Sequence, residues 1–68
     1  MSFTVQLNGE SRLFDQPTTV AELVELLGYT GKRMAVERNG AIVPKSQHAN
    51  VQLENGDELE IVIAVGGG

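Results

Sequence analysis

Apolar and polar residues alternate in two stretches near the ends of the chain, residues 3–7 and 58–65. Because successive side chains of a β-strand point to opposite faces, this alternation predicts two strands. They are the most regular strands of the chain, and we expect them to pair in the centre of a sheet. In the second stretch, Leu59, Ile61, Ile63 and Val65 share one face, and the opposite face changes from Glu58 and Glu60 to Val62 and Ala64.

Two Asn-Gly pairs mark hairpins. Asn8-Gly9 follows the first strand, and Asn39-Gly40 follows a short strand expected at residues 34–38. Both residues of such a pair tolerate positive φ, so each pair predicts a tight turn. We expect the returning strands at residues 12–14 and 41–43.

The segment before the last strand is polar and irregular. Pro44 has no N–H to donate and ends the second hairpin. A short turn of helix is expected around residues 48–51. His48, the only histidine, has no motif relation to a nucleophile or a carboxylate, so we interpret it as a loop or packing residue. Asn55-Gly56-Asp57 predicts a third turn, with Asp57 as a turn residue.

One helix is predicted over about residues 19–27. Thr19 and Glu22 have the spacing of a capping box. Apolar residues at positions 20, 23, 24 and 27 form one stripe, and Gly28 stands where a left-handed residue would end the helix. Two strands, a helix and then further strands predict an α+β domain with one helix across a mixed sheet.

The size of the chain favours a module that acts by docking. With 68 residues it forms one domain, and an enclosed substrate pocket would hollow out so small a core. We therefore expect no catalytic residue of its own. The chain has no cysteine and one histidine, so we expect no metal site, and any sulfur it handles must come from outside.

Charge and hydropathy limit the partners and the compartment. The formal net charge is −4, and the five basic residues are scattered, which argues against nucleic-acid binding. Only Lys32 and Arg33 are adjacent, and we interpret them as a solvated loop. No long apolar run and no signal-peptide pattern are present, so we expect no membrane span and a cytoplasmic location.

Three glycines, Gly66, Gly67 and Gly68, follow the last predicted strand. We expect residues 1–65 to form the domain and residues 66–68 to be a flexible tail with the α-carboxylate on Gly68. Glycine has no Cβ, so this acyl group is unhindered, and three extended residues reach about 10 Å. Gly66 and Gly67 would enter a partner's active site, where ATP could activate the Gly68 carboxylate for attack by sulfur or nitrogen. A frayed chain end is the alternative.

Val62, Ala64 and Val65 precede this tail and form a candidate docking surface, because an apolar patch beside a reactive end suits a partner. The alternative is that both faces of a central strand are buried. Val65 also continues the face expected to lie in the core.

The chain resembles the ThiS family of ubiquitin-like sulfur carriers of thiamine biosynthesis over essentially its whole length. The resemblance is carried by residues 5–10, by Thr19 to Leu23, by Ala35-Val36-Glu37-Arg38-Asn39-Gly40 with Ile42-Val43-Pro44, by residues 55–61 and by the end, Ala64 to Gly68. Only Gly67 and Gly68 match the reactive motif of the family directly, and Gly66 is an additional glycine.

The resemblance implies a β-grasp fold, in which one helix packs across a mixed sheet of four to five strands. It implies that Gly68 is adenylated by an E1-like adenylyltransferase of the ThiF type and becomes a thiocarboxylate (1-thioglycine). The sulfur would come from a cysteine desulfurase relay and pass to a thiazole synthase of the ThiG type. No cofactor would be bound by the chain itself, because ATP is used by the activating partner.

Three other functions remain open at the level of sequence. A molybdopterin sulfur carrier of the MoaD type shares the fold and the glycine end, although the middle segment fits it less well. A ubiquitin-like modifier would form isopeptide bonds with lysines of other proteins. A β-grasp binding module with an incidental tail is the third.

Overall fold

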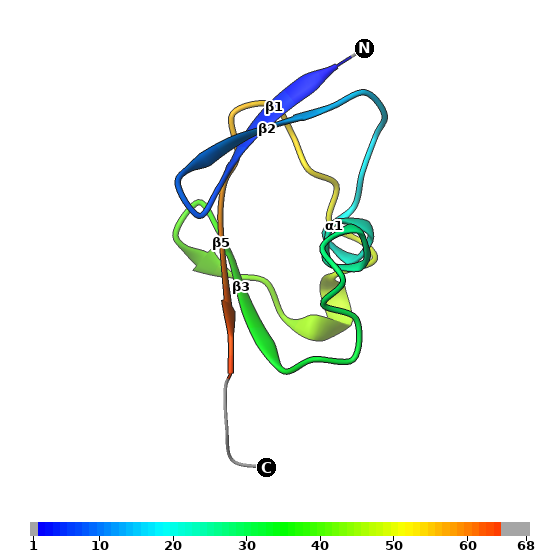
Figure 1. Ribbon diagram of the computed structural model, residues 1–68, viewed down its shortest axis with the longest axis vertical. Coiled ribbons are helices and arrows are strands. Elements are labelled where there is room, and N and C mark those ends of the chain that lie inside the picture. Colours follow the sequence, from blue (N-terminus) through cyan, green and yellow to red (C-terminus); the bar gives the residue numbers. More distant parts are fainter. Residues whose placement is uncertain (1, 65–68) are drawn as a thin grey trace.

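The computed structural model describes residues 2–64 and places one helix on one side of a five-stranded sheet (Figure 1). The elements follow in the order β1 (Phe3–Leu7), β2 (Glu10–Phe14), α1 (Val20–Leu26), β3 (Met34–Arg38), β4 (Ala41–Ile42), the 3-10 turn η1 (Lys45–Gln47) and β5 (Glu58–Ile63).

The strands lie in the order β2-β1-β5-β3-β4, so the first and last strands pair in the centre, as predicted. β1 and β5 run parallel, with Gln6 opposite Glu58. The β1–β2 and β3–β4 hairpins and the β3–β5 pair are antiparallel. A mixed sheet crossed by a single helix confirms the predicted β-grasp fold, with five strands.

Helix α1 covers the inner face of the sheet. Thr19 is its N-cap, and the predicted capping box is present, because the Thr19 hydroxyl accepts from the Glu22 N–H and the Glu22 carboxylate accepts from the Thr19 N–H. Gly28 follows the C-cap with a φ of +77°, which confirms the predicted stop. Neither helical segment within residues 2–64 has the length and apolar content needed to cross a bilayer.

The core is a single layer between the helix and the sheet. Its fully buried centre consists of Val5, Val20, Leu23, Val36 and Leu59, which come from β1, α1, β3 and β5. The apolar stripe predicted for the helix therefore packs against the apolar face predicted for the strands. Phe3 and Phe14 stack at one end, with ring centroids 5.3 Å apart.

Several element boundaries differ from the prediction. β4 ends at Ile42 rather than residue 43, and β5 ends at Ile63, before Ala64. β2 begins at Glu10 rather than residue 12, because Asn8 and Gly9 both take positive φ and pairing resumes at once with Leu7 opposite Glu10. The short helical turn spans Lys45–Gln47 rather than residues 48–51, and His48 closes it with an N–H bond to the Lys45 carbonyl. The chain enters this turn directly from Pro44.

The capping box gives a first testable expectation. Thr19→Ala should lower the free energy of unfolding by about 1 kcal/mol, because the Glu22 N–H loses its acceptor at the helix start. Urea denaturation followed by circular dichroism measures the change. Thr30→Ala, in an exposed loop, is the matched control and should change the free energy by less than about 0.5 kcal/mol. Equal effects of the two substitutions would contradict the capping role.

Candidate transfer and docking site

Strand β5 leads directly to the glycine end of the chain and is held on both sides. β1 pairs with its beginning, and β3 pairs along it from Leu59 to Ile63. Beyond the strand, the Ala64 N–H donates to the Arg33 carbonyl at 2.9 Å. Val65 and Gly66–Gly68 lie outside the described residues, so the expectations for them remain predictions. The last described residue is thus fixed to the sheet.

Asn8 extends the contact between β1 and β5 past the end of β1. The Asn8 N–H donates to the Leu59 carbonyl at 2.8 Å. Its side-chain Oδ1 accepts from the Ile61 N–H at 2.8 Å, and its Nδ2 donates to the Ile61 carbonyl at 3.2 Å. The side-chain amide therefore takes the place of one more peptide unit of β1. The sequence indicated the turn at Asn8 but not this second role.

Asn39, in the other Asn-Gly turn, holds the beginning of β5 from the opposite side. The Asn39 N–H donates to the Glu58 carbonyl at 2.7 Å, and Asn39 Oδ1 accepts from the Glu58 N–H at 2.9 Å. Its Nδ2 donates to the Asp57 carboxylate at 3.1 Å. The two turns predicted as hairpin loops thus also clamp the strand that leads to the tail.

Asp57 joins these contacts into one network. Its carboxylate is buried and accepts from Arg38 Nε at 2.8 Å, from the Glu54 N–H at 2.8 Å and from Asn39. Burial is the largest influence and by itself raises the pKa of this carboxyl, but the hydrogen bonds and the Arg38 charge outweigh it and lower the pKa below its usual value. The bond to Asp57 in turn raises the pKa of the Arg38 guanidinium.

The predicted docking surface lies on the outer face of the sheet, away from the helix. Val62 is 63% exposed and Ala64 is exposed, whereas Leu59 and Ile61 are buried on the core face. Burial of both faces, the alternative, is therefore wrong for the described residues. Ala35, paired with Val62 and also exposed, extends the apolar surface. That Val62 and Ala64 dock onto a partner stays a prediction, and Val65 lies outside the described residues.

A histidine, two loop cations and two strand carboxylates were also considered in the sequence. His48 is half-buried, and its Nε2 donates to the Val43 carbonyl at 3.1 Å, in keeping with a packing role. Lys32 and Arg33 are exposed in the loop before β3, and Glu58 and Glu60 are on the solvent face of β5, as expected. Among residues 2–64, no three His, Asp or Glu side chains are grouped to hold a metal ion.

Comparison with known proteins places this architecture in one family. The model of the ThiS family matches residues 5–68. The sulfur carrier protein ThiS of Bacillus subtilis is 37% identical over 65 residues, which are 94% of this chain and 98% of that protein. A thiazole synthase of Paramagnetospirillum magneticum is 50% identical over 62 residues, and one of Magnetococcus marinus is 38% identical over 64 residues. The chain spans about a fifth of the length of these two synthases.

A solved structure agrees with the sequence relatives. The crystal structure of the thiamine biosynthesis protein ThiS from Geobacter metallireducens superposes with a TM-score of 0.81 at 25% sequence identity. The match covers 97% of this chain and all of that chain. The family match over nearly the whole sequence and the shared fold lead to the same conclusion: this chain belongs to the ThiS family.

Proposed function

We propose that this chain is the sulfur carrier of thiamine biosynthesis and that it works through the carboxylate of Gly68. The observation that carries the proposal is the position of the glycines. In a member of the ThiS family, they begin two residues after Ala64, which is bonded to Arg33 at the end of a strand clamped from both sides. The fixed strand gives a partner a defined point from which the tail extends.

The chemistry begins with activation, because a carboxylate is a poor electrophile. An oxygen of the Gly68 carboxylate attacks the α-phosphorus of ATP, pyrophosphate leaves, and an acyl adenylate forms. Hydrosulfide then attacks the acyl carbon, AMP leaves, and a thiocarboxylate remains. The chain has no cysteine, so the sulfur atom comes from outside. The chain contributes the acyl group, and its partner contributes the catalytic groups.

Membership of the ThiS family implies three partners for this chemistry. An E1-like adenylyltransferase of the ThiF type would form the adenylate. A cysteine desulfurase relay would deliver the sulfur as a persulfide, from which a thiol reductant would release hydrosulfide. A thiazole synthase of the ThiG type would receive it, and two relatives of this chain carry that enzyme's name. ATP would bind to the activating partner, and no cofactor would bind to the carrier itself.

The test is the mass of the intact protein after incubation with ATP, a ThiF-type enzyme and sulfide. Replacement of one oxygen by sulfur should raise the mass by about 16 Da. An unchanged mass would refute the proposal, as would a cellular protein that continues past Gly68, because the thiocarboxylate requires a terminal acyl group. Adducts with lysines of other proteins would identify a modifier instead.

The docking surface on the sheet gives a further prediction. Val62→Asp should raise the KM for the carrier in ATP–pyrophosphate exchange about tenfold, because docking would bury the new carboxylate against an apolar surface. Leu13→Asp is the matched control. Leu13 is 68% exposed on the same face but lies opposite Thr4, towards the other end of the sheet. Equal changes in KM for the two variants would contradict docking at Val62.

A further inference from the structure

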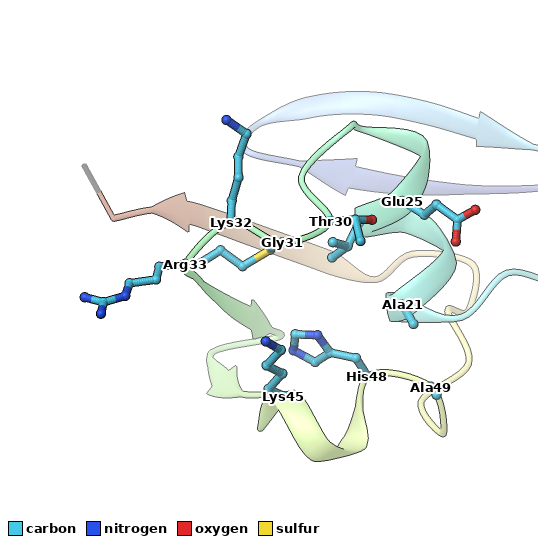
Figure 2. A pocket seen from close by; sticks show the side chains of 11 residues that line it. Ala21, Glu25, Thr30, Gly31, Lys32, Arg33, Lys45, His48 and Ala49 are labelled. Atoms are coloured by element: carbon cyan, nitrogen blue, oxygen red, sulfur yellow. The ribbon is translucent and has the colours of Figure 1, made fainter. Parts of the chain in front are cut away.

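A groove of about 540 Å³ opens on the helix side of the molecule, between α1, the loop at residues 28–33 and turn η1 (Figure 2). Its more buried lining residues include Val24, which is buried, with Ala21 and Met34, which are half-buried. Its exposed lining residues include three cations, Lys32, Arg33 and Lys45. The groove therefore combines an apolar interior with a basic rim.

The groove lining is positively charged, whereas the rest of the chain is negatively charged. Three of the five Lys and Arg residues line the groove together with one carboxylate, Glu25, which gives its lining a formal charge of +2. The other residues hold two cations and eight carboxylates, a formal charge of −6, and together they account for the net −4. The outer sheet face belongs to the acidic part, with Glu58 and Glu60 exposed on it.

The rim cations have no carboxylate partner within the part of the chain that the structure describes. Both ion pairs found in residues 2–64 belong to Arg38, which is not in the groove. Figure 2 shows the Glu25 carboxylate well separated from the Arg33 guanidinium. Among the described residues, no ion pair therefore neutralises Lys32, Arg33 or Lys45.

Backbone hydrogen bonds fix both walls. The Ala21 N–H donates to the His48 carbonyl at 2.9 Å, which ties turn η1 to the first turn of the helix. On the other wall, the Lys32 N–H donates to the Tyr29 carbonyl at 3.0 Å. The bond from Ala64 to Arg33 joins this wall to the last described residue, two positions before the first glycine of the tail. A partner that takes up the tail would therefore meet the groove at the same time.

We propose that the groove binds an acidic segment of the enzyme that activates the tail. This proposal rests on the proposed function and adds the chemistry of a second contact surface. Carboxylates of the segment would pair with Arg33 and Lys45 on the two walls, and an apolar side chain between them would cover Val24 and Met34. Complementary charge speeds encounter and fixes orientation, so it would direct the tail into the active site.

An extended peptide fits the lining better than a nucleotide does. The cations stand on two separate walls, with Lys32 and Arg33 in one loop and Lys45 in the turn opposite, so they are not gathered around one phosphate group. The lining contains no Phe, Tyr or Trp on which a base could stack, and its one aromatic ring, His48, is bonded to the Val43 carbonyl. A peptide with an apolar side chain between two acidic ones would place its carboxylates at the basic rim on each wall and its apolar side chain in the interior.

Single charge reversals test the proposal in ATP–pyrophosphate exchange with the ThiF-type enzyme. Lys45→Glu and Arg33→Glu, one on each wall, should each raise the KM for the carrier about fivefold at low salt and leave kcat unchanged. Added salt should raise the KM of the original chain more than that of either variant. Arg12→Glu is the matched control, because it changes the net charge equally but lies on β2, at the other edge of the sheet. Its KM should change less than twofold.

Each outcome decides a separate point. Exchange by the original chain with no change in either groove variant would overturn the groove proposal alone. An equal effect of Arg12→Glu would also overturn it, because net charge would then explain the result. Absence of exchange by the original chain would refute the proposed function, and the groove proposal with it. Calorimetry with ATP and the isolated chain tests the nucleotide alternative. Binding of ATP that is lost in Lys45→Glu would make the groove a nucleotide site and overturn the proposal that it binds an acidic segment.

Discussion

Deletion of Gly68 is expected to abolish the gain of about 16 Da on incubation with ATP, the activating enzyme and sulfide. The shortened chain still ends in two glycines, so its terminal acyl group is as unhindered as before. What changes is reach, because the carboxylate moves back by about 3.5 Å relative to the clamped strand. A displacement of that size takes the reacting carboxylate out of position for attack on ATP, and rate depends steeply on such positioning. Intact mass spectrometry over a time course measures the loss.

Gly66→Ala is the control that separates reach from composition. It keeps the length and the final Gly67-Gly68, and adds one methyl group at the position where the family motif does not require glycine. We expect the mass gain to persist in this variant. Gly67→Val should abolish the gain at full length, because a β-branched side chain beside the acyl group would not enter a narrow channel. Normal loading of the chain without Gly68 would show that distance from β5 does not matter, and the clamped strand would lose its proposed role.

Much of this fold could be predicted from local patterns in the sequence. Alternation located β1 and β5, and the capping box with Gly28 located α1, because each of these signals depends on residues close together in the chain. The central pairing of β1 with β5 followed from their regularity. The start of β2 was placed two residues late because Glu10 and Ser11 are polar and exposed on an edge strand, where burial imposes little pattern.

The contacts that position the site could be predicted much less well. Asp57 was interpreted as a turn residue. Its hydrogen bond with Arg38 joins two positions 19 residues apart, the turn before β5 and the end of β3. Asn8 bonds to Ile61 across 53 residues. The groove likewise gathers Arg33, from a segment interpreted as a solvated loop, and Lys45, from the polar segment before the last strand. Contacts of this kind depend on the tertiary arrangement, so no local pattern of residues indicates them.

Asp57→Asn should lower the free energy of unfolding at pH 7 by about 2–3 kcal/mol, because the buried acceptor loses its charge while Arg38 keeps its own. A domain of this length has a total stability of roughly 3–10 kcal/mol, so the loss would be a large fraction. It would also loosen the start of β5, where Asn39 and the Glu54 N–H share the same carboxylate. Asp15→Asn, at an exposed position, is the control and should cost less than about 0.5 kcal/mol. Urea titrations of the three proteins give the comparison.

The pH dependence of this difference identifies its cause. The pKa of Asp57 is lowered in the folded chain, so the folded state binds its proton less readily than the unfolded state does. The stabilisation is therefore complete above the unfolded pKa of about 3.9 and is lost as pH falls through the lower folded value. Between about pH 5 and pH 2 the original chain should lose stability faster than Asp57→Asn, so the gap between them should narrow. A difference in the free energy of unfolding that stays constant over that range would show that altered packing, rather than loss of the carboxylate charge, weakens the variant. It would disprove that the charge of Asp57 stabilises the start of β5.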